Sequence, residues 1–368
     1  MENYIINELS EAQFNDFRDK WTDLISKANC DQLFLSWEWI NTWWSVFGNP
    51  KTDKLKIITV TDINNQLVGI APLFITKTLT KKIINSRRLQ FLGNYWHGKV
   101  TMRSELLEFI VSPTNTDSII LSILKYIFSS DEWDEIVFSE LRIESDTYRL
   151  FTKSKYFKNC YSRNHDSFNS YYLPTTGQFD EYLNSLGKNT RLKLYNRRKL
   201  LNTLGDVHFE TGINNEINIR LEQLNQLHEK RWGNPVFSNK RLAFNRIIAT
   251  LMSSNNQLSF SVLTIDKNIV SIQFNYNIKG HIYNIQAGFD ESVHKKIALG
   301  YLHFGFEIEN TFNSGYKVYD FLAGNGKNSP YKKHLTKESV NITTLQYIRS
   351  PILRLLYKTY DTLSKSGN

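Results

Sequence analysis

The first half of the chain alternates between hydrophobic patterns typical of helices and patterns typical of strands. The stretch 34–48 has apolar residues at helical spacing behind Ser36, a residue suited to cap a helix N-terminus. Strand-like runs follow at 54–62, 66–76, 87–93 and 134–141, and a helix that is apolar nearly all round is predicted at 118–130. This order indicates a mixed α/β fold.

The second half repeats this order. Helical stretches are predicted from about Asp180 to Leu204 and from about Glu216 to Trp232. Strands are predicted at 258–266, 269–278, 281–290 and 316–325, with a helix at 301–312. The segment VTDINNQLVGIAPLF of the first half resembles LTIDKNIVSIQFNY of the second, which favours two related domains. The Pro and Gly of 173–177 predict the boundary between them.

Polar amides alternate with apolar residues along two predicted strands of the second half. The alternation places Gln273 and Asn275 on one face of their strand. In the next strand it places Asn284 and Gln286 on one face and Phe289 on the other. Amides both donate and accept hydrogen bonds, so these strands can form the floor of a polar ligand site. A sheet with one face in water gives the same pattern, and both interpretations stay open.

A basic loop separates the predicted strand 281–290 from the helix that follows. It carries Lys295 and Lys296, then a small residue and a glycine, immediately before the helix. The free N–H groups and the positive dipole end of a helix N-terminus attract anions, so this order favours a phosphate site. A solvated basic loop is the alternative.

Asp320 is a lone acid in a strand of aromatic and aliphatic residues. One interpretation is a carboxylate that accepts a proton or orients a charge during a reaction. The other is a structural residue that holds the turn at Gly324–Gly326. Tyr331 and Lys332 follow a proline shortly afterwards.

Composition and charge narrow the class of protein. The 368 residues are 41% hydrophobic and 22% charged, which is typical of a globular chain of about two domains. The formal charge of +9 and six basic residues without an acid in 185–200 favour an anionic partner, although a solvated basic face also fits. Two distant cysteines indicate a cytoplasmic protein without disulfides, and no membrane span is expected. The eight histidines show no metal-binding spacing, so we expect no metal.

Four stretches of the second half resemble the GNAT acyltransferase superfamily. The resemblance is nearest to its CelD-like or BioF2-like acetyltransferase branch and extends distantly to FemAB-type peptidyltransferases. The stretches are KNTRLKLYNRRKLLNTLG (188–205), NIQAGFD (284–290), KKIALGYLHFGFEI (295–308) and YDFLAGNGKNSPYK (319–332). The family's phosphate loop reads Arg/Gln-x-x-Gly-x-Gly/Ala. The segment KKIALG places Lys295, Ala298 and Gly300 at these three positions, two of which depart from the pattern.

The resemblance implies an α/β fold with mixed sheets, built as two tandem GNAT-like domains of which the second carries the acyl-CoA site. It also implies that the strands at 281–290 and 316–322 splay apart to admit the donor. We expect an N-terminal GNAT-like domain over 1–175, a GNAT acyltransferase domain over 176–349 and a helical tail over 350–368.

The tail has an apolar side and basic residues elsewhere. Ile352, Leu355, Leu356 and Leu363 share one side of the predicted helix, which Ser350 and Pro351 begin. Packing of this side on the domain and docking on an anionic membrane are both compatible with the pattern.

The implied activity is transfer of an acyl group from acetyl-CoA, or another acyl-CoA, to an amine. We expect the amine to belong to a sugar or to a precursor of a cell-surface polysaccharide. By analogy with the family, Asp320 and Tyr331 are the expected catalytic residues, and Lys295, Lys296, Ala298 and Gly300 hold the cofactor. The expected substrate contacts are Arg191, Trp232, Gln273, Gln286 and Lys332.

Two alternatives to this function stay open. One is a FemAB-like transferase that depends on aminoacyl-tRNA. The other is a non-catalytic basic protein that binds nucleic acid or acts as a scaffold. Apart from tRNA, nucleic acid is not an expected partner, because stacking aromatics are nearly missing from the basic stretch.

Overall fold

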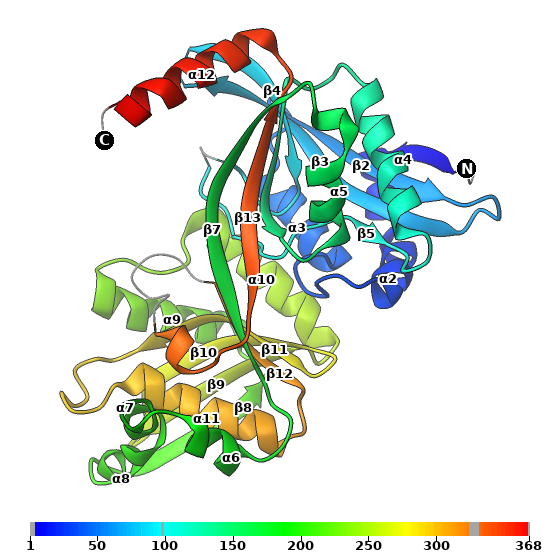
Figure 1. Cartoon of the computed structure of the whole chain (residues 1–368). Coiled ribbons are helices and arrows are strands. Elements are labelled where there is room, and N and C mark those ends of the chain that lie inside the picture. The colour runs from blue at the N-terminus through cyan, green and yellow to red at the C-terminus, as the bar shows by residue number, and fades with distance from the viewer. Residues whose placement is uncertain (1–3, 82, 97–98, 324–330, 367–368) are drawn as a thin grey trace. The chain divides into compact units, whose positions relative to one another are not determined.

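The computed structural model describes residues 4–81, 83–96, 99–323 and 331–366, and it divides into two compact units (Figure 1). The first unit comprises Met1–Phe168 and Val340–Asn368, and the second comprises Asn169–Ser339. These bounds differ from the predicted ranges 1–175, 176–349 and 350–368, because the chain returns to the first unit after Ser339.

The first unit is a sheet with helices on its faces. Its elements are β1 (Ile5–Leu9), α1 (Glu11–Asn15), α2 (Arg18–Lys27), α3 (Trp37–Phe47), β2 (Asp53–Thr61), β3 (Leu67–Thr80), β4 (Ile84–Phe91), β5 (Ile110–Val111), α4 (Thr116–Ser129), β6 (Glu135–Arg142), α5 (Asp146–Lys153), η1 (Lys155–Phe157), β13 (Ser339–Ile348) and α12 (Pro351–Ser366). The strand order is β1-β2-β3-β4-β6-β13-β7, to which β7 (Tyr161–Pro174) contributes its first residues, and β5 pairs with β3. Every element predicted in this half is present, and Ser36 caps α3 by accepting the Trp39 N–H at 3.2 Å.

The second unit has the same plan. Its elements are α6 (Phe179–Ser185), α7 (Lys188–Arg191), η2 (Leu192–Asn196), α8 (Arg198–Leu201), β8 (Val207–Ile213), α9 (Ile217–Trp232), α10 (Asn239–Ser254), β9 (Leu258–Ile265), β10 (Asn268–Ile278), β11 (His281–Phe289), α11 (Leu299–Asn313), β12 (Val318–Leu322) and η4 (Lys332–His334). The end of β7 (Tyr161–Pro174) completes a sheet of order β8-β9-β10-β11-β12-β7.

The two sheets follow one topology, which confirms the predicted tandem α/β architecture. In each, helices separate the first two strands, and another helix leads from the fourth strand to a strand parallel to it. The parallel ladder is short in both units. It joins Arg88–Gln90 to Glu135–Val137 in the first unit, and His281–Tyr283 to Val318–Asp320 in the second.

The sheet of each unit includes a strand that follows the other repeat of the sequence. β13 follows the second repeat but pairs with β6 of the first unit. β7 follows the first repeat, and its last residues, Tyr171–Pro174, pair with β12 of the second unit. Neither strand was predicted. β7 reads YSRNHDSFNSYYLP, a polar run without a clear alternation of apolar residues.

The prediction of one long helix from Asp180 to Leu204 is wrong, because the structure has several short helical segments there. The chain leaves the helical conformation at Leu186 and Gly187, and a π-helical turn, η2, follows α7. This turn packs closely on α11, where a Cβ atom on Gly305 would lie 2.0 Å from the carbonyl oxygen of Leu194. The glycine therefore permits a close approach between the two segments.

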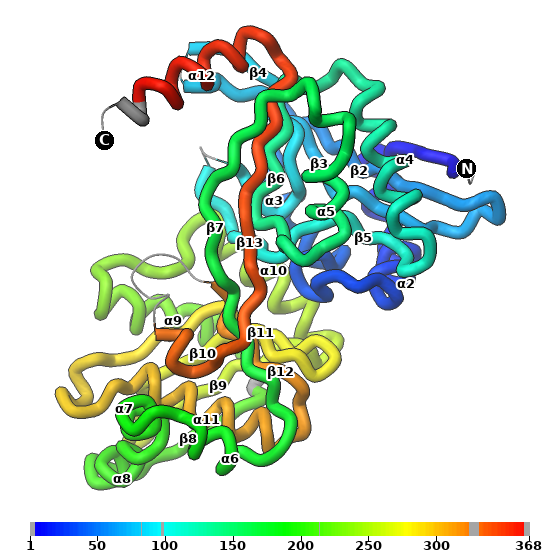
Figure 2. Tube along the Cα trace, in the orientation of Figure 1, coloured from blue at the N-terminus to red at the C-terminus, as the bar shows by residue number. Residues whose placement is uncertain are grey.

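The tail forms the predicted helix, α12, which lies beside the turn between β3 and β4 (Figure 2). Leu353 and Tyr357 are its buried side chains, and they pack with Ile348 and against Ile84 and Tyr161. Among the described residues, no helix combines the length and the apolar content that crossing a membrane requires.

Candidate functional site

In the second unit, β11 and β12 diverge after a short parallel ladder. β11 stays paired with β10 as far as Phe289, whereas its pairing with β12 in the described part of the chain ends at Tyr283. β12 itself ends at Leu322, whose φ of 57° lies in the left-handed region. The structure thus has the splayed strands that the resemblance implied.

A β-bulge in β11 lies at the start of this divergence. Phe274 pairs with Gln286 and Asn275 pairs with Asn284, which leaves Ile285 as the extra residue. The bulge shifts the alternation of side chains, so the expectation that Asn284 and Gln286 share a face is wrong. Gln286 lies opposite Phe274, whose ring packs against other aromatic rings. Its Nε2 atom donates to the neighbouring Ala287 carbonyl at 3.3 Å.

The sheet face under α11 carries a layer of buried amides. The Oε1 atom of Gln273 accepts hydrogen bonds from the Tyr319 hydroxyl at 2.7 Å and from Asn284 Nδ2 at 3.3 Å. Asn284 Nδ2 also donates to Asn275 Oδ1 at 2.7 Å. Gln273 is 1% exposed and Asn275 is 0% exposed, so the interpretation of this face as one in water is wrong. Gln273 Nε2 and Asn275 Nδ2 have no hydrogen-bond partner among the described residues.

Two titratable groups that sequence reasoning missed lie one turn apart on the buried side of α11. His303 forms hydrogen bonds with Ser261 Oγ at 3.1 Å and Ser271 Oγ at 2.6 Å, and burial lowers its pKa to about 3. Glu307 accepts from Thr211 Oγ1 at 3.1 Å, and burial raises its pKa to about 7. The spacing of four residues within a predicted helix was the available signal.

Asp320 is buried at the last pair of the parallel ladder. Its Oδ2 atom lies 3.0 Å from His281 Nε2, and its Oδ1 atom accepts the Leu322 N–H at 2.7 Å. Lys332 Nζ donates to the carbonyls of Phe321 and Leu322 at 2.6 and 2.8 Å. Asp320 and Lys332 therefore hold Leu322 in its left-handed conformation. The turn Gly324–Gly326, which we expected Asp320 to hold, lies outside the described residues.

Tyr331 lies among aromatic rings near the start of α11. Its ring centroid is 5.5 Å from that of Tyr301 and 6.0 Å from that of Phe304. Burial raises the pKa of the Tyr331 phenol, and the nearby Arg231 guanidinium opposes this shift. The phenol is therefore neutral at physiological pH and able to donate a proton.

Arg231, at the end of α9, is a further residue that sequence reasoning missed. Its guanidinium lies 4.3 Å from the ring centroid of Phe289 and 4.6 Å from that of Trp232. Its Nε atom is 2.6 Å from Glu291 Oε1. Trp232 is 52% exposed, which leaves a flat ring surface open beside this cation.

The loop before α11 is basic because its acids are paired elsewhere. Asp290 pairs with Lys230 of α9 at 2.6 Å, and Glu291 pairs with Arg231. Lys295 and Lys296 are exposed and have no ion pair with any residue that the structure describes. The loop therefore carries a net positive charge immediately ahead of the helix.

The first turn of α11 comes close to β11. The N-cap residue Ala298 offers no side-chain hydrogen bond, so side-chain capping does not satisfy the free N–H groups of this turn. A Cβ atom on Gly300 would lie 2.5 Å from the Phe289 ring, so the glycine allows this close packing.

The basic stretch at the start of the second unit is only partly neutralised. Arg198 pairs with Glu309, and its guanidinium lies 3.9 Å from the Phe306 ring centroid. Lys193 Nζ lies 5.5 Å from the Tyr301 ring centroid, and Arg191 donates to Asn184 at 3.4 Å. The remaining cations, Lys188, Arg197 and Lys199, have no ion pair within the described ranges.

In the first unit, the chain's own side chains fill the corresponding divergence between β4 and β6. Leu107 N–H donates to the Glu140 carbonyl at 2.8 Å, and Leu107 forms a parallel bridge with Leu141. The Phe91 and Phe138 ring centroids are 4.6 Å apart, and Phe109 packs against both. In the described chain, apolar side chains therefore fill the space between these strand ends.

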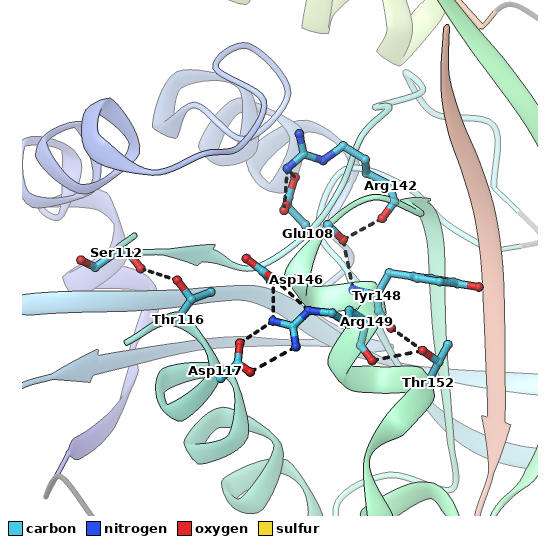
Figure 3. Close-up of polar contacts among 10 residues, drawn as sticks. Glu108, Ser112, Thr116, Asp117, Arg142, Asp146, Tyr148, Arg149 and Thr152 are labelled. Carbon is cyan, nitrogen blue, oxygen red and sulfur yellow. Dashed lines mark hydrogen bonds and ion pairs between the residues drawn. The ribbon is translucent and has the colours of Figure 1, made fainter. Parts of the chain in front are cut away.

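Ion pairs anchor the filling segment and the helices around it (Figure 3). Arg142 of β6 pairs with Glu108 at 2.9 Å. Arg149 of α5 pairs with Asp146 at 2.7 Å and also with Asp117 of α4. These contacts stabilise the packed strand ends of the first unit at the position where the strands of the second unit diverge.

In the part of the chain that the structure describes, no three His, Cys, Asp or Glu side chains are grouped to hold a metal ion.

We expect Glu307→Gln to change how stability depends on pH. The pKa of Glu307 is about 7 in the folded chain, against an ordinary value of 4.5. As pH rises between these values, the unfolded chain loses this proton first, so the free energy of unfolding of the native protein falls. The free energy of unfolding of the variant, relative to that of the native protein, should therefore rise by about 2 to 3 kcal/mol over this pH range. Above this range the difference should stay constant.

Chemical denaturation at a series of pH values measures this difference. The substitution Glu222→Gln, at an exposed position on α9, is the matched control. The difference in the free energy of unfolding between this variant and the native protein should not change with pH. The lowered pKa of His303 acts in both proteins and cancels. A Glu307→Gln difference that does not vary between pH 4.5 and 7 would contradict the assigned burial of this carboxyl.

Comparison with known proteins extends these observations. A family model described as an acetyltransferase (GNAT) domain matches residues 188–333, which include β8 to β12 and the site described above. No curated protein matches the chain.

Solved structures share the fold over nearly the whole chain. The crystal structure of FemX is 11% identical, with a TM-score of 0.61, and the match covers 95% of this chain and 99% of FemX. The structure of L-PGS from Bacillus licheniformis is 12% identical, with a TM-score of 0.53, and the match covers 94% of this chain and 95% of that chain. At such identities the likeness shows the fold. The match of residues 188–333 supports an acyltransferase domain of the GNAT superfamily in the second unit, and the fold of the chain is shared with FemX.

Proposed function

We propose that the chain is an N-acyltransferase whose donor, acetyl-CoA or another acyl-CoA, binds in the second unit. The donor would lie between β11 and β12 and over the start of α11. The observation that carries this proposal is the divergence of the two strands beside a helix N-terminus without a side-chain cap. The corresponding divergence in the first unit is filled by Leu107 and Phe109.

The residues at the divergence fit the chemistry of coenzyme A. A pyrophosphate can accept hydrogen bonds from the first-turn N–H groups of α11, with Lys295 and Lys296 supplying positive charge. Lysine supplies this charge as a point cation rather than as the planar fork of arginine. Beyond Tyr283, the edge of β11 that is not paired with β12 leaves backbone groups for the amides of the pantetheine arm.

Acyl transfer to an amine forms a C–N bond and breaks the thioester C–S bond. The ammonium proton of the acceptor must leave, and the departing thiolate must gain a proton. Tyr331 supports the second step, because its neutral phenol is beside the start of α11. Asp320 uses both of its oxygens to hold His281 and Leu322, so we assign it a positioning role.

The acceptor in this proposal is an amine on a sugar or a polysaccharide precursor. Trp232 supports this choice, because an exposed indole beside the Arg231 cation offers a flat surface on which a sugar ring can stack. Lys332 is less suited to contact the substrate than its sequence position indicated, since its ammonium group is buried against backbone carbonyls.

A second candidate is transfer of an aminoacyl group from tRNA. The FemX-like fold of both units favours it, as does the group of cations Lys188, Arg197 and Lys199 without ion-pair partners in the described chain. RNA binding through such cations is strongly dependent on salt concentration.

We expect Lys295→Glu/Lys296→Glu to weaken coenzyme A binding by about tenfold or more, because two cations beside the phosphates become anions. Isothermal titration calorimetry with coenzyme A measures the effect. Lys188→Glu/Lys199→Glu reverses the same amount of charge on the basic stretch and is the matched control. Under the proposal this control retains its affinity for coenzyme A.

Equal affinity in the native protein and the Lys295→Glu/Lys296→Glu variant would exclude a phosphate site at this loop. If the native protein fails to bind coenzyme A, binds an aminoacyl-tRNA, and loses that binding in the Lys188→Glu/Lys199→Glu variant, the second candidate replaces the first.

We also expect Tyr331→Phe to lower kcat by about two powers of ten, because the thiolate then leaves without a proton donor. Steady-state kinetics with acetyl-CoA measures this loss. An acyl donor with a more acidic thiol should restore much of the rate. Tyr301→Phe removes the hydroxyl of the neighbouring ring and should leave kcat nearly unchanged.

The variant Asp320→Asn distinguishes a positioning role of Asp320 from a role in proton transfer. We expect a lower melting temperature but turnover per folded molecule near that of the native protein, because the amide keeps the shape and part of the hydrogen bonding. A loss of two to four powers of ten in turnover, at unchanged stability, would instead make Asp320 the catalytic base.

A further inference from the structure

An apolar stripe runs along α12 on the side that faces away from the first unit. Ile352, Leu355 and Leu363 are 66%, 69% and 67% exposed, and their spacing places them on one side of the helix. The helix packs on the unit through Leu353 and Tyr357 instead. Of the predicted apolar side, Leu356 packs on the domain, whereas the other three residues are exposed in the described chain.

The turn between β3 and β4 extends this stripe. Leu79 and Ile83 of that turn region are 52% and 71% exposed. Lys81, between them, places its Nζ atom 3.4 Å from the ring centroid of Tyr360 on α12. This contact places the two segments side by side. We call their exposed apolar residues together the α12 patch: Leu79, Ile83, Ile352, Leu355 and Leu363.

A cationic hollow adjoins the α12 patch. The hollow has a volume of about 390 Å³, and its lining consists of Lys158, Asn159, Cys160, Tyr161, Arg354 and Lys358. No acid is among these residues. Asp361, the acid of α12, is engaged instead by Arg163 at 2.6 Å and by the Tyr161 hydroxyl at 2.9 Å. The Nε atom of Arg354 is buried without a hydrogen-bond partner among the described residues.

We propose that the α12 patch docks on an anionic lipid bilayer. The helix would lie in the plane of the membrane surface, with its apolar stripe among the acyl chains and a lipid phosphate at the cationic hollow. A helix with an exposed apolar side and basic residues beside it has the amphipathic character of interfacial helices. This inference does not depend on the proposed acyl donor or acceptor.

Charge favours a lipid surface over a second copy of the chain. A symmetric dimer through the stripe would leave Arg354 and Lys358 without an anion, because these cations lie more than about 100° around α12 from Ile352 and Leu363. The hollow offers no acid, and Asp361 is already paired within its own chain. An anionic surface satisfies the apolar and the cationic groups together.

Sedimentation with lipid vesicles tests the proposal on the full chain. We expect binding to vesicles of phosphatidylglycerol and phosphatidylcholine in equal parts, weaker binding at high salt, and little binding to pure phosphatidylcholine. The variant Ile352→Ser/Leu355→Ser/Leu363→Ser should bind at least about tenfold more weakly, because the inserted apolar surface is lost. Since these side chains are exposed, its melting temperature should match that of the native protein.

The variant Ile219→Ser/Ile247→Ser is the matched control. It removes exposed apolar side chains from α9 and α10, outside the patch, and should retain vesicle binding. The proposal fails if the native protein does not bind the anionic vesicles, or if the control loses binding as the α12 variant does. It also fails if light scattering shows a dimer that the α12 variant dissociates.

Discussion

The short parallel ladder between β11 and β12 is the constraint on which the candidate site depends. Pairing stops at Tyr283 and Asp320, and the carboxylate of Asp320 binds His281 on one side and the Leu322 N–H on the other. A left-handed residue is costly outside glycine, and Lys332 helps to hold Leu322 in that conformation through two backbone carbonyls. These contacts fix the point at which the strands separate.

The same constraint has opposite consequences in the two units. In the first, the chain between β4 and α4 inserts Leu107 and Phe109 at the divergence, and the opening is packed with apolar side chains. In the second, the shorter connection carries Lys295 and Lys296 and leads directly into α11. One topology therefore yields a domain whose strand divergence is filled by apolar side chains and a domain whose diverging strands lie beside a basic loop.

Hydrophobic periodicity was sufficient to predict the helices and strands that are amphipathic or uniformly apolar. The helix over Trp37–Phe47 and the strands at 258–266 and 269–278 are present, because burial of their apolar residues determines their conformation locally. The polar strand β7 is stabilised by pairing with distant residues, which a local pattern does not reveal. The bulge at Ile285 likewise depends on the register with β10, so the orientation of Gln286 was mispredicted. His281 and Arg231 were missed because their partners, Asp320 and Phe289, are distant in the sequence.

Hydrogen exchange with and without coenzyme A tests most directly whether the second unit alone keeps an open strand divergence. We expect slower exchange in the presence of coenzyme A for the amides of Leu299–Tyr301 and of β11 beyond Tyr283, because these groups would face the bound donor. Exchange over Ile84–Val111 of the first unit should not change. Protection of that first-unit segment, or binding of coenzyme A without protection at the start of α11, would contradict this assignment.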